Sequence, residues 1–465
     1  MRNNKNILLD FDWFLLILYF LLVIAGFLTV YSVAFNPESP SIFSFSEKYG
    51  KQLMWILISL FCGSIILLID AEIFKKISIP IYLIVLALLV IVLFMPPING
   101  ARAWLGIGSL GIQPAEFAKI SSSLLLASYL SSINLKHQTN KNIFLAFGII
   151  FIPMFLILLQ PDAGTFLVFT SFLFVFYREG VSFDPLFLFI INRIPNINYK
   201  NTWVGVHFIP IAFFLAFLAV LSLLSSKFYI VFSLFSKYNF DGFFVLIFVL
   251  VILAVSLVLI VLKWGSKRNK KNYILAISLS AFLSILFVSF VQFGFNKLAS
   301  HQKNRIELFL GIKSDPDGQD YNRNRAMAAV GSGGFYGKGY KNASVSSVRT
   351  NHVPESETDF IFCPFAEEWG FLGSFVIVCL FSLFILRILY IAERQRSSFN
   401  RIYGYCIGMI FFYHFLINIG MNIGFAPIIG IPLPFFSCGG SSFLSFTIML
   451  FLLLKLDSQR MSVLS

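Results

Sequence analysis

The chain of 465 residues is 58% hydrophobic and only 12% charged, with a mean hydropathy of +0.84. An ordinary soluble protein carries about 25% charged residues, so this composition excludes a soluble globular enzyme. The formal net charge of +13 could suggest nucleic-acid binding. In a membrane protein, however, the placement of Lys and Arg beside the spans sets the orientation, so we expect membrane lipids around the chain and no nucleic-acid partner.

Apolar runs of about 18 residues or more, long enough to cross a bilayer core as a helix, recur along almost the whole chain. They are apolar on every side, whereas the strands of a membrane β-barrel alternate apolar and polar residues. The sequence thus predicts an all-α fold, a polytopic integral membrane helix bundle with about ten to twelve transmembrane helices. In chain order the expected spans are 12–34, 52–69, 78–95, 115–132, 143–159, 164–177, 207–224, 243–262, 273–294, 371–391, 402–423 and 441–454.

The polar segments between these spans indicate the orientation. If the N-terminus is cytoplasmic, Lys and Arg gather in the inside loops, as in the cluster 263–271, and are few in the short outside loops. The longest polar stretch, 295–370, is then a large extracytoplasmic loop within a single membrane domain covering 1–465. We therefore expect a multi-pass protein with a cytoplasmic N-terminus and its chemistry on the outer face.

Neither the cysteines nor the glycine-rich stretch GSGGFYGKG matches a familiar metal, disulfide or nucleotide motif. The five cysteines are scattered, without disulfide or zinc-ligand spacing. The glycine-rich stretch GSGGFYGKG fails the phosphate-loop pattern, because Ser332 stands where the first glycine should be and Gly339 follows Lys338. No soluble cofactor site is predicted from either pattern.

The outer loop that ends at Pro114 leads into a helix that carries charge inside the membrane. Pro114 and Glu116 provide typical helix-start chemistry. Glu116 and Lys119 share one helical face, and Lys119 lies about one turn deep, where a charge is costly unless paired or facing a wet cavity. The pair either braces the bundle or lines a cavity for an anionic head group, and the residues alone leave both interpretations open.

Three further outer segments contain polar residues of interest. Asp162, in a short break between two apolar helices, is expected to cap the second helix. The large loop interleaves acids and bases, a mixture suited to general-base chemistry on a phosphorylated substrate, although a solvated loop with a turn at SDPDG is the alternative. Glu367 and Glu368 should favour the start of the helix that follows them. The stretch GIPLPFFSCGGSS predicts non-helical backbone at membrane depth, lining a cavity open to the outside.

These residues fall in motifs that carry a family resemblance. The motifs are ARAWLGIGSLGIQPAEFAK, QPDAGT, SDPDGQDYNRNRAMAAVGSGGFYGKG, VPESETDFIFCPFAEEWGFLG and GIPLPFFSCGGSS. In this order they resemble the SEDS family of bacterial cell-wall polymerases, the RodA, FtsW and SpoVE group. The resemblance implies a peptidoglycan glycosyltransferase that polymerises lipid II into glycan strands at the outer face of the bacterial cytoplasmic membrane. It implies as partners a class B penicillin-binding protein, which is the transpeptidase, and other cell-wall elongation proteins.

The resemblance also implies roles for single residues. Asp315, at the D-P step of the large loop, would be the catalytic base that takes the proton from the acceptor hydroxyl. Arg102 and Lys119 would meet the charge of the diphosphate leaving group, with Glu116 orienting Lys119. A divalent cation could share that task, and its ligands stay unknown. The other residues expected to bind substrate are Gln113, Asp162, Arg325, Lys338 and Asp359.

The chain departs from the family pattern in several places. Ala115, Glu357 and Cys438 stand where the family has serine, histidine and tyrosine. The family has ten spans, so the additional apolar segments between Tyr177 and Ala299 form an extra pair whose purpose the sequence does not give. The motif GIPLP and the stretch 302–310 resemble the elongation branch, which maintains cell shape, more than the division branch.

Other functions fit the same cavity. A flippase for the lipid-linked peptidoglycan precursor would use an outward cavity and an intramembrane ion pair, but would have no need of one specific carboxylate in an outer loop. An FtsW-like polymerase acting in cell division is a second alternative. A non-catalytic scaffold for other wall-synthesis proteins is a third, and it predicts that activity survives the loss of Asp315.

Overall fold

The computed structural model describes most of the chain and divides it into two compact units. The described residues are 11–35, 43, 45, 47–96, 102–106, 111–133, 139–181, 207–225, 229–231, 239–264, 270–297, 303, 307, 319–346, 353–426 and 428–460. Unit 1 comprises Met1–Thr202 and Tyr321–Ser465, and unit 2 comprises Trp203–Asp320. The prediction of one domain over 1–465 did not distinguish these units.

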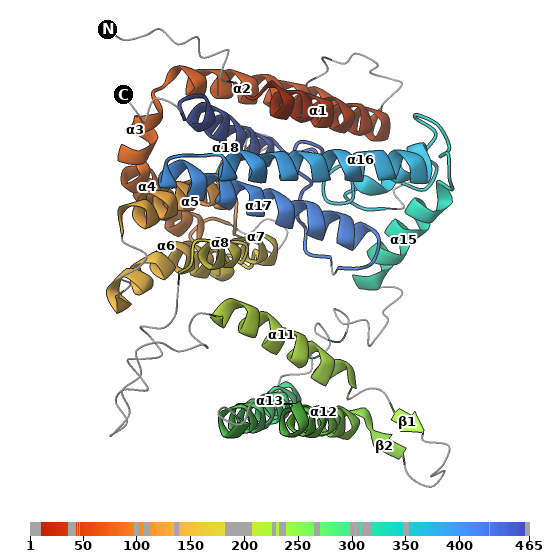
Figure 1. Ribbon diagram of the computed structural model, residues 1–465. Helices are drawn as coiled ribbons and strands as arrows, with labels where there is room; N and C mark the ends of the chain where they lie inside the picture. Colours follow the sequence, from red (N-terminus) through yellow and green to blue (C-terminus); the bar gives the residue numbers. More distant parts are fainter. Residues whose placement is uncertain are drawn as a thin grey trace. The chain divides into compact units, whose positions relative to one another are not determined.

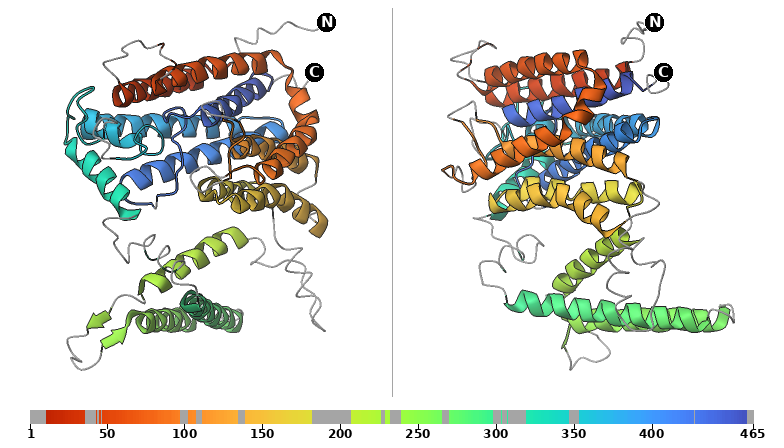
Figure 2. Two further views of the ribbon diagram at one scale, coloured as in Figure 1. Left: turned by 180° about the vertical axis from the view of Figure 1, so that it is seen from behind. Right: turned by 90° about the vertical axis from the view of Figure 1, so that its left-hand side faces the viewer.

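Unit 1 is a bundle of helices (Figure 1), which Figure 2 shows from behind and from the side. Its first half contains α1 (Trp13–Ala34), α2 (Lys48–Leu68), α3 (Ala71–Lys76), α4 (Ser78–Val92), α5 (Pro114–Ser132), α6 (Asn140–Leu159), α7 (Ala163–Phe169) and α8 (Phe172–Arg178). Its second half contains α15 (Gln319–Ser332), which begins at the boundary between the units, α16 (Phe362–Glu393), α17 (Ser398–Asn422) and α18 (Gly440–Ser458). The main packing partners are α2 with α18, α16 with α17, and α5 with both α4 and α17.

Unit 2 consists of three helices and a small hairpin. The helices are α11 (Phe208–Ser225), α12 (Gly242–Trp264) and α13 (Lys270–Lys297), and the strands are β1 (Tyr229–Val231) and β2 (Asn239–Asp241). The strands pair antiparallel, with Tyr229 opposite Asp241. All three helices contact one another. In the most hydrophobic stretch of α12, no residue is buried inside the protein, as expected of a helix that faces lipid.

The prediction of an all-α membrane bundle is confirmed. Every expected span coincides with a helix, and among the described residues eight helices are long and apolar enough to cross a membrane. Shorter apolar helices cover Ser78–Val92, Ala163–Arg178 and Pro210–Leu224. The helix α5 is less hydrophobic than these eight helices, because its face toward the bundle carries charged and hydroxyl side chains. Thr170 and Ser171 divide the expected span 164–177 into α7 and α8.

The segment after α17 enters the bundle as irregular backbone, which confirms the prediction of a non-helical chain there. Phe435 and Phe436 in this segment are 1% and 0% exposed. Phe435 has a φ of 62°, in the left-handed region that side chains rarely adopt. Its ring lies 4.9 Å from that of Tyr19 on α1 and 5.4 Å from that of Phe411 on α17. The segment therefore forms part of the core between α1 and α17.

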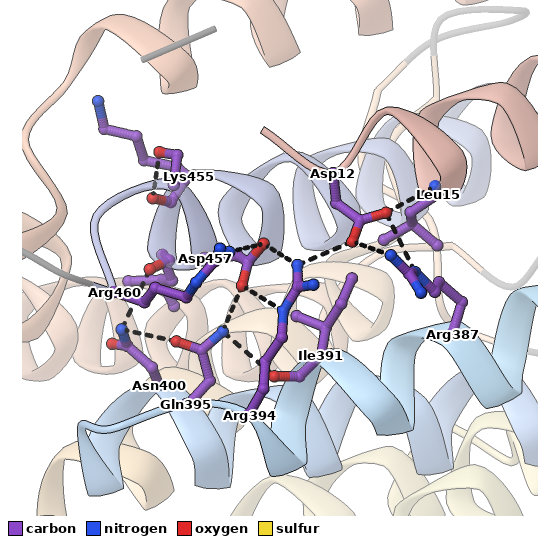
Figure 3. A network of polar contacts seen from close by, with 12 residues as sticks. Asp12, Leu15, Arg387, Ile391, Arg394, Gln395, Asn400, Lys455, Asp457 and Arg460 are labelled. Atoms are coloured by element: carbon purple, nitrogen blue, oxygen red, sulfur yellow. Dashed lines mark hydrogen bonds and ion pairs between the residues drawn. The ribbon is translucent and has the colours of Figure 1, made fainter. Parts of the chain in front are cut away.

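A network of ion pairs lies where the N-terminal end of α1 meets the C-terminal ends of α16 and α18 (Figure 3). Asp12, which caps α1, accepts from Arg387 and Arg394 at 2.8 and 2.7 Å, and Arg394 also contacts Asp457 near the end of α18. Burial opposes ionisation of Asp12, but the hydrogen bond and charge of Arg387 and the charge of Arg394 hold the pKa of this carboxyl below its usual value. The network thus ties the start of α1 to the ends of α16 and α18.

Candidate functional site

The intramembrane ion pair expected on α5 is present. Pro114 is the first residue of α5, and Lys119 Nζ lies 2.8 Å from Glu116 Oε2. Ser445 Oγ on α18 donates to the same carboxylate oxygen at 2.9 Å. Glu116 is 2% exposed and Lys119 is 0% exposed. Since removing one partner of a buried ion pair leaves an uncompensated charge, this arrangement favours the bracing interpretation, and direct contact of Lys119 with substrate stays a prediction.

A histidine that the sequence analysis missed completes this cluster. Lys119 Nζ lies 2.9 Å from His414 Nε2 on α17, and His414 Nδ1 lies 3.0 Å from the carbonyl oxygen of Pro432. The Lys119 ammonium also faces the Phe446 ring at 4.8 Å. A buried lysine is therefore held by groups from three helices, α5, α17 and α18.

The polar face of α17 holds the irregular segment in place. His414, Asn418 and Asn422 follow one another at intervals of four residues, so they share one side of the helix. Asn418 Nδ2 donates to the carbonyl oxygens of Ile431 at 2.7 Å and Asp359 at 2.9 Å. Both asparagines are 0% exposed. This four-residue spacing in an otherwise apolar span was the signal that could have identified them.

Asp162 caps α7, as the sequence predicts. It accepts hydrogen bonds from the backbone nitrogen and the hydroxyl of Thr165, both at 2.9 Å. Gln113 Nε2, at the start of α5, donates to Asp162 Oδ2 at 2.8 Å. Next to this cap, a Cβ on Gly164 would lie 3.1 Å from the carbonyl oxygen of Ile429, so α7 and the irregular segment are in close contact.

Asp359 joins the same region from the loop before α16. A Cβ on Gly430 would lie 3.2 Å from Asp359 Oδ2. Burial raises the pKa of Asp359 to about 7, with further contributions from the charge and hydrogen bond of the Glu355 carboxyl and from the charge of Asp162. Asp162 and Asp359 therefore lie close enough to interact, and Asp359 lies next to Gly430 of the irregular segment.

Lys338 occupies a different place, against the kink of α16. Gly370 has a φ of 65° and interrupts the helical backbone. The glycine-rich stretch 333–339 satisfies the groups that the kink frees, since Lys338 N donates to Glu367 O at 3.0 Å and Phe371 N donates to Gly334 O at 2.9 Å. The Lys338 ammonium lies 2.5 Å from the fully buried carboxylate of Glu367. The stretch GSGGFYGKG therefore holds the kinked part of α16 through backbone hydrogen bonds.

Glu367 has a structural role, as expected, but its partners differ from those predicted. The prediction assigned it to the start of a helix, whereas α16 already begins at Phe362. Its carboxylate accepts from the backbone nitrogens of Ser344, Val345 and Ser346 at 2.9 to 3.0 Å. The partners come from a loop of the preceding chain, and Glu367 holds this loop against α16.

The remaining predicted residues are spread out. Arg102 is exposed and donates to the carbonyl oxygen of Leu93 at 3.2 Å. Arg325 lies half-buried on α15. Asp315, the expected catalytic base, lies outside the described residues. The structure therefore brings Gln113, Glu116, Lys119, Asp162 and Asp359 together around the segment 429–432, while Lys338 lies against the kink of α16.

Two of the departures from the family pattern lie side by side. Cys438 N donates to the carbonyl oxygen of Glu357 at 2.9 Å, and the Glu357 carboxylate forms an ion pair with Lys48 on α2. Burial raises the pKa of the Cys438 thiol to about 11. Glu357 and Cys438, the two positions at which the sequence predicts departures, are thus joined by a direct backbone contact.

Comparison with known proteins places these features in a family. The chain matches the FtsW, RodA and SpoVE family model, described as a cell cycle protein, over residues 12–204 and 249–462. It is 30% identical to the peptidoglycan glycosyltransferase RodA of Treponema pallidum, covering 97% of this chain and 98% of that protein. It is 27% identical to the peptidoglycan glycosyltransferase MrdB of Escherichia coli K12, over 91% and 88% of the two chains.

Solved structures share the fold. A chain of a peptidoglycan synthase complex that coordinates polymerization and crosslinking superimposes with a TM-score of 0.64 at 22% identity, over 97% of this chain and 98% of that one. The rod shape determining protein RodA of Thermus thermophilus gives a TM-score of 0.54 at 20% identity, over the same shares. The family match skips 205–248, a range that contains α11, so α11 lies in the region where the sequence placed extra apolar segments.

Proposed function

The chain belongs to the FtsW, RodA and SpoVE family, and we propose that it is a peptidoglycan glycosyltransferase that polymerises lipid II into glycan strands. One observation carries this proposal: the family match extends through the site, and the motif residues Gln113, Glu116, Lys119, Asp162 and Asp359 converge around one irregular segment. The first relatives reported above carry the names RodA and MrdB, which supports a role in elongation and cell shape.

The proposed reaction uses a carboxylate base and cations. The hydroxyl oxygen of the acceptor sugar attacks the anomeric carbon of the donor, and Asp315 takes the proton of that hydroxyl. The bond between the anomeric carbon and the undecaprenyl diphosphate breaks at the same time. The charge that develops on the leaving diphosphate requires cationic groups. Arg102 is exposed and accessible for this role. Lys119 is buried, so it would act through the electrostatic field of its ammonium group and through the packing around Glu116.

A divalent cation remains part of the proposal as a helper for the diphosphate. Within the described ranges, no group of three His, Cys, Asp or Glu side chains is arranged to hold a metal ion. A cation would therefore be held mainly by the substrate diphosphate, since Mg²⁺ is commonly bound through one or two carboxylates together with substrate phosphates.

The two ends of the unit 1 bundle suggest its orientation in the cytoplasmic membrane. Arg387, Arg394 and Arg460 lie at the end that holds Asp12 and Asp457, and excess Lys and Arg is typical of the cytoplasmic side. The site lies at the opposite ends of the same helices. We therefore assign the site to the outer face. Reporter fusions after Lys270 and after Asp317 should read inside and outside, and the reverse result would contradict this orientation.

The outer face also suits the proposed partners. The similar solved chain belongs to a complex that coordinates polymerization with crosslinking. We propose a class B penicillin-binding protein as the partner that crosslinks the new strands, together with other elongation proteins. Co-purification from membranes in mild detergent would test this pairing.

The deciding experiment is glycan-strand formation from purified lipid II by the protein with its penicillin-binding partner. Wild type should polymerise, and Asp315→Ala should abolish polymerisation at equal folded amounts. Asp317→Ala, in the same loop, is the matched control and should retain activity. If no form polymerises while lipid II crosses a vesicle bilayer in both wild type and Asp315→Ala, the protein is a flippase instead.

A further inference from the structure

His414 joins two parts of the site that are distant in sequence. Its Nε2 lies 2.9 Å from Lys119 Nζ, 295 residues away, and its Nδ1 lies 3.0 Å from the carbonyl oxygen of Pro432. The side chain is 2% exposed, and its ring packs edge-on against Phe446 with the centroids 4.8 Å apart. The imidazole is therefore enclosed and held at both nitrogens.

The partners of His414 determine its protonation. A carbonyl oxygen only accepts hydrogen bonds, so Nδ1 must carry a hydrogen to bond Pro432. A second hydrogen on Nε2 would create an imidazolium beside the Lys119 ammonium, and neither group could accept from the other. His414 is therefore a neutral imidazole in the Nδ1–H form, which accepts from Lys119 through Nε2.

The segment bound by His414 contacts the carboxylates of the site. Ile431, next to Pro432, is held by Asn418, and Gly430 abuts the Asp359 carboxylate. Ile429 lies against Gly164, in the helix that Asp162 caps. A shift of Pro432 would therefore move the backbone between Asp162 and Asp359.

We propose that His414 is a positioning residue that sets the segment 429–432 relative to the Glu116–Lys119 pair, and thereby orients Asp162 and Asp359 for glycan polymerisation. This proposal rests on the proposed function. We expect the alignment of Asp162 and Asp359 to matter more in the transition state than in substrate binding, so the loss of His414 should lower kcat more than it raises KM.

Nitrogen-15 NMR of histidine-labelled protein tests the protonation directly. The chain has five histidines, and the signal that disappears in His414→Asn identifies the one of interest. We expect a neutral ring with hydrogen on Nδ1 at neutral pH. A ring protonated on Nε2, or on both nitrogens, would contradict the proposal whether or not the protein polymerises lipid II.

A matched pair of variants tests the link. In His414→Gln the side-chain oxygen can still accept from Lys119, whereas in His414→Asn the amide can still donate to Pro432. Both should reduce kcat on lipid II by about tenfold to a hundredfold, since small misplacements of a reacting group have effects of this size. KM should change by no more than about threefold, less than 1 kcal/mol. A variant with wild-type kcat would show that its lost contact does no positioning.

Tyr403→Phe is the structural control. It removes a buried hydrogen bond of 3.2 Å from α17 to the carbonyl oxygen of Met449, but not one in the site. Its thermal stability should fall about as much as that of the His414 variants, while its kcat should stay at the wild-type value. Equal stability losses with unchanged kcat in all three variants would show that His414 contributes only to the packing of the bundle. If wild type itself does not polymerise, the proposed function fails and the NMR result still decides the protonation.

Discussion

Gln113 and Asp162 stand at the starts of two different helices and are joined by a hydrogen bond of 2.8 Å between Gln113 Nε2 and Asp162 Oδ2. Asp162 therefore has two roles, capping α7 and fixing the entry to α5. Asp162→Ala should lower the free energy of unfolding by about 1 kcal/mol through the lost cap and should also reduce polymerisation. Thermal unfolding in detergent and the lipid II assay measure the two effects.

Thr139→Ala is the control for this prediction. Thr139 caps α6 through its hydroxyl, which accepts from Asn142 N at 3.3 Å, and it lies outside the site. It should cost a similar stability with no change in polymerisation rate. Equal rate losses in both variants would assign the effect of Asp162 to stability alone.

The Asp359 carboxyl should make stability depend on pH. Its pKa is about 7 in the folded protein and near 4 in an unfolded chain, so the folded state binds the proton more tightly. The contribution of this group is therefore greatest below about pH 4, falls as pH rises, and is lost above about pH 7. Asp359→Asn should remove this part of the decline in melting temperature between pH 4 and 8. A variant with the same slope as wild type would rule out Asp359 as its source.

The kink at Gly370 should not tolerate a side chain. Gly370 has a φ of 65°, and a Cβ there would lie 2.3 Å from Gly337 N and 2.7 Å from Phe335 O. Gly370→Ala should cost about 1–3 kcal/mol from the backbone conformation alone, and more from the clash. Gly331 on α15 has open space around it, so Gly331→Ala should be neutral or stabilise by up to about 1 kcal/mol. Melting temperatures of the two variants test this contrast, and similar values would refute it.

The two interpretations of Lys338 can be separated through Glu367. If Lys338 only braces the loop, Lys338→Met and Glu367→Gln should both speed hydrogen exchange at the backbone amides of 344–346, with equal effects on KM. If Lys338 also binds the diphosphate, Lys338→Met should raise KM for lipid II further than Glu367→Gln does. We expect the bracing result, because the ammonium already contacts Glu367, Ser332 and Ser344 at 2.5 to 2.9 Å.

Most of the helices were predictable because most spans are apolar runs long enough to cross a bilayer. The exceptions carry no such signal. The helix α3 has only six residues, and α15 (QDYNRNRAMAAVGS) contains only short apolar stretches. The boundary between the two units also leaves no mark in composition, since apolar spans lie on both sides of Thr202.

The site was predictable where its contacts are local. The spacing of three residues identified Glu116 and Lys119, and the helix break identified Asp162 as a cap. The partners of His414 and Asn418 come from chain segments that only the fold brings together. Lys338 is predicted to bind substrate, and its contact with Glu367, 29 residues along the chain, has no local signal in the sequence.

The Asp12 network has a consequence for biosynthesis. The Asp12 carboxylate is synthesised just before the first helix, yet its guanidinium partner Arg387 is made 375 residues later. Until α16 is inserted, a nascent chain holds α1 without the counterions that its buried end requires. Closure of this end is therefore a late step of membrane insertion.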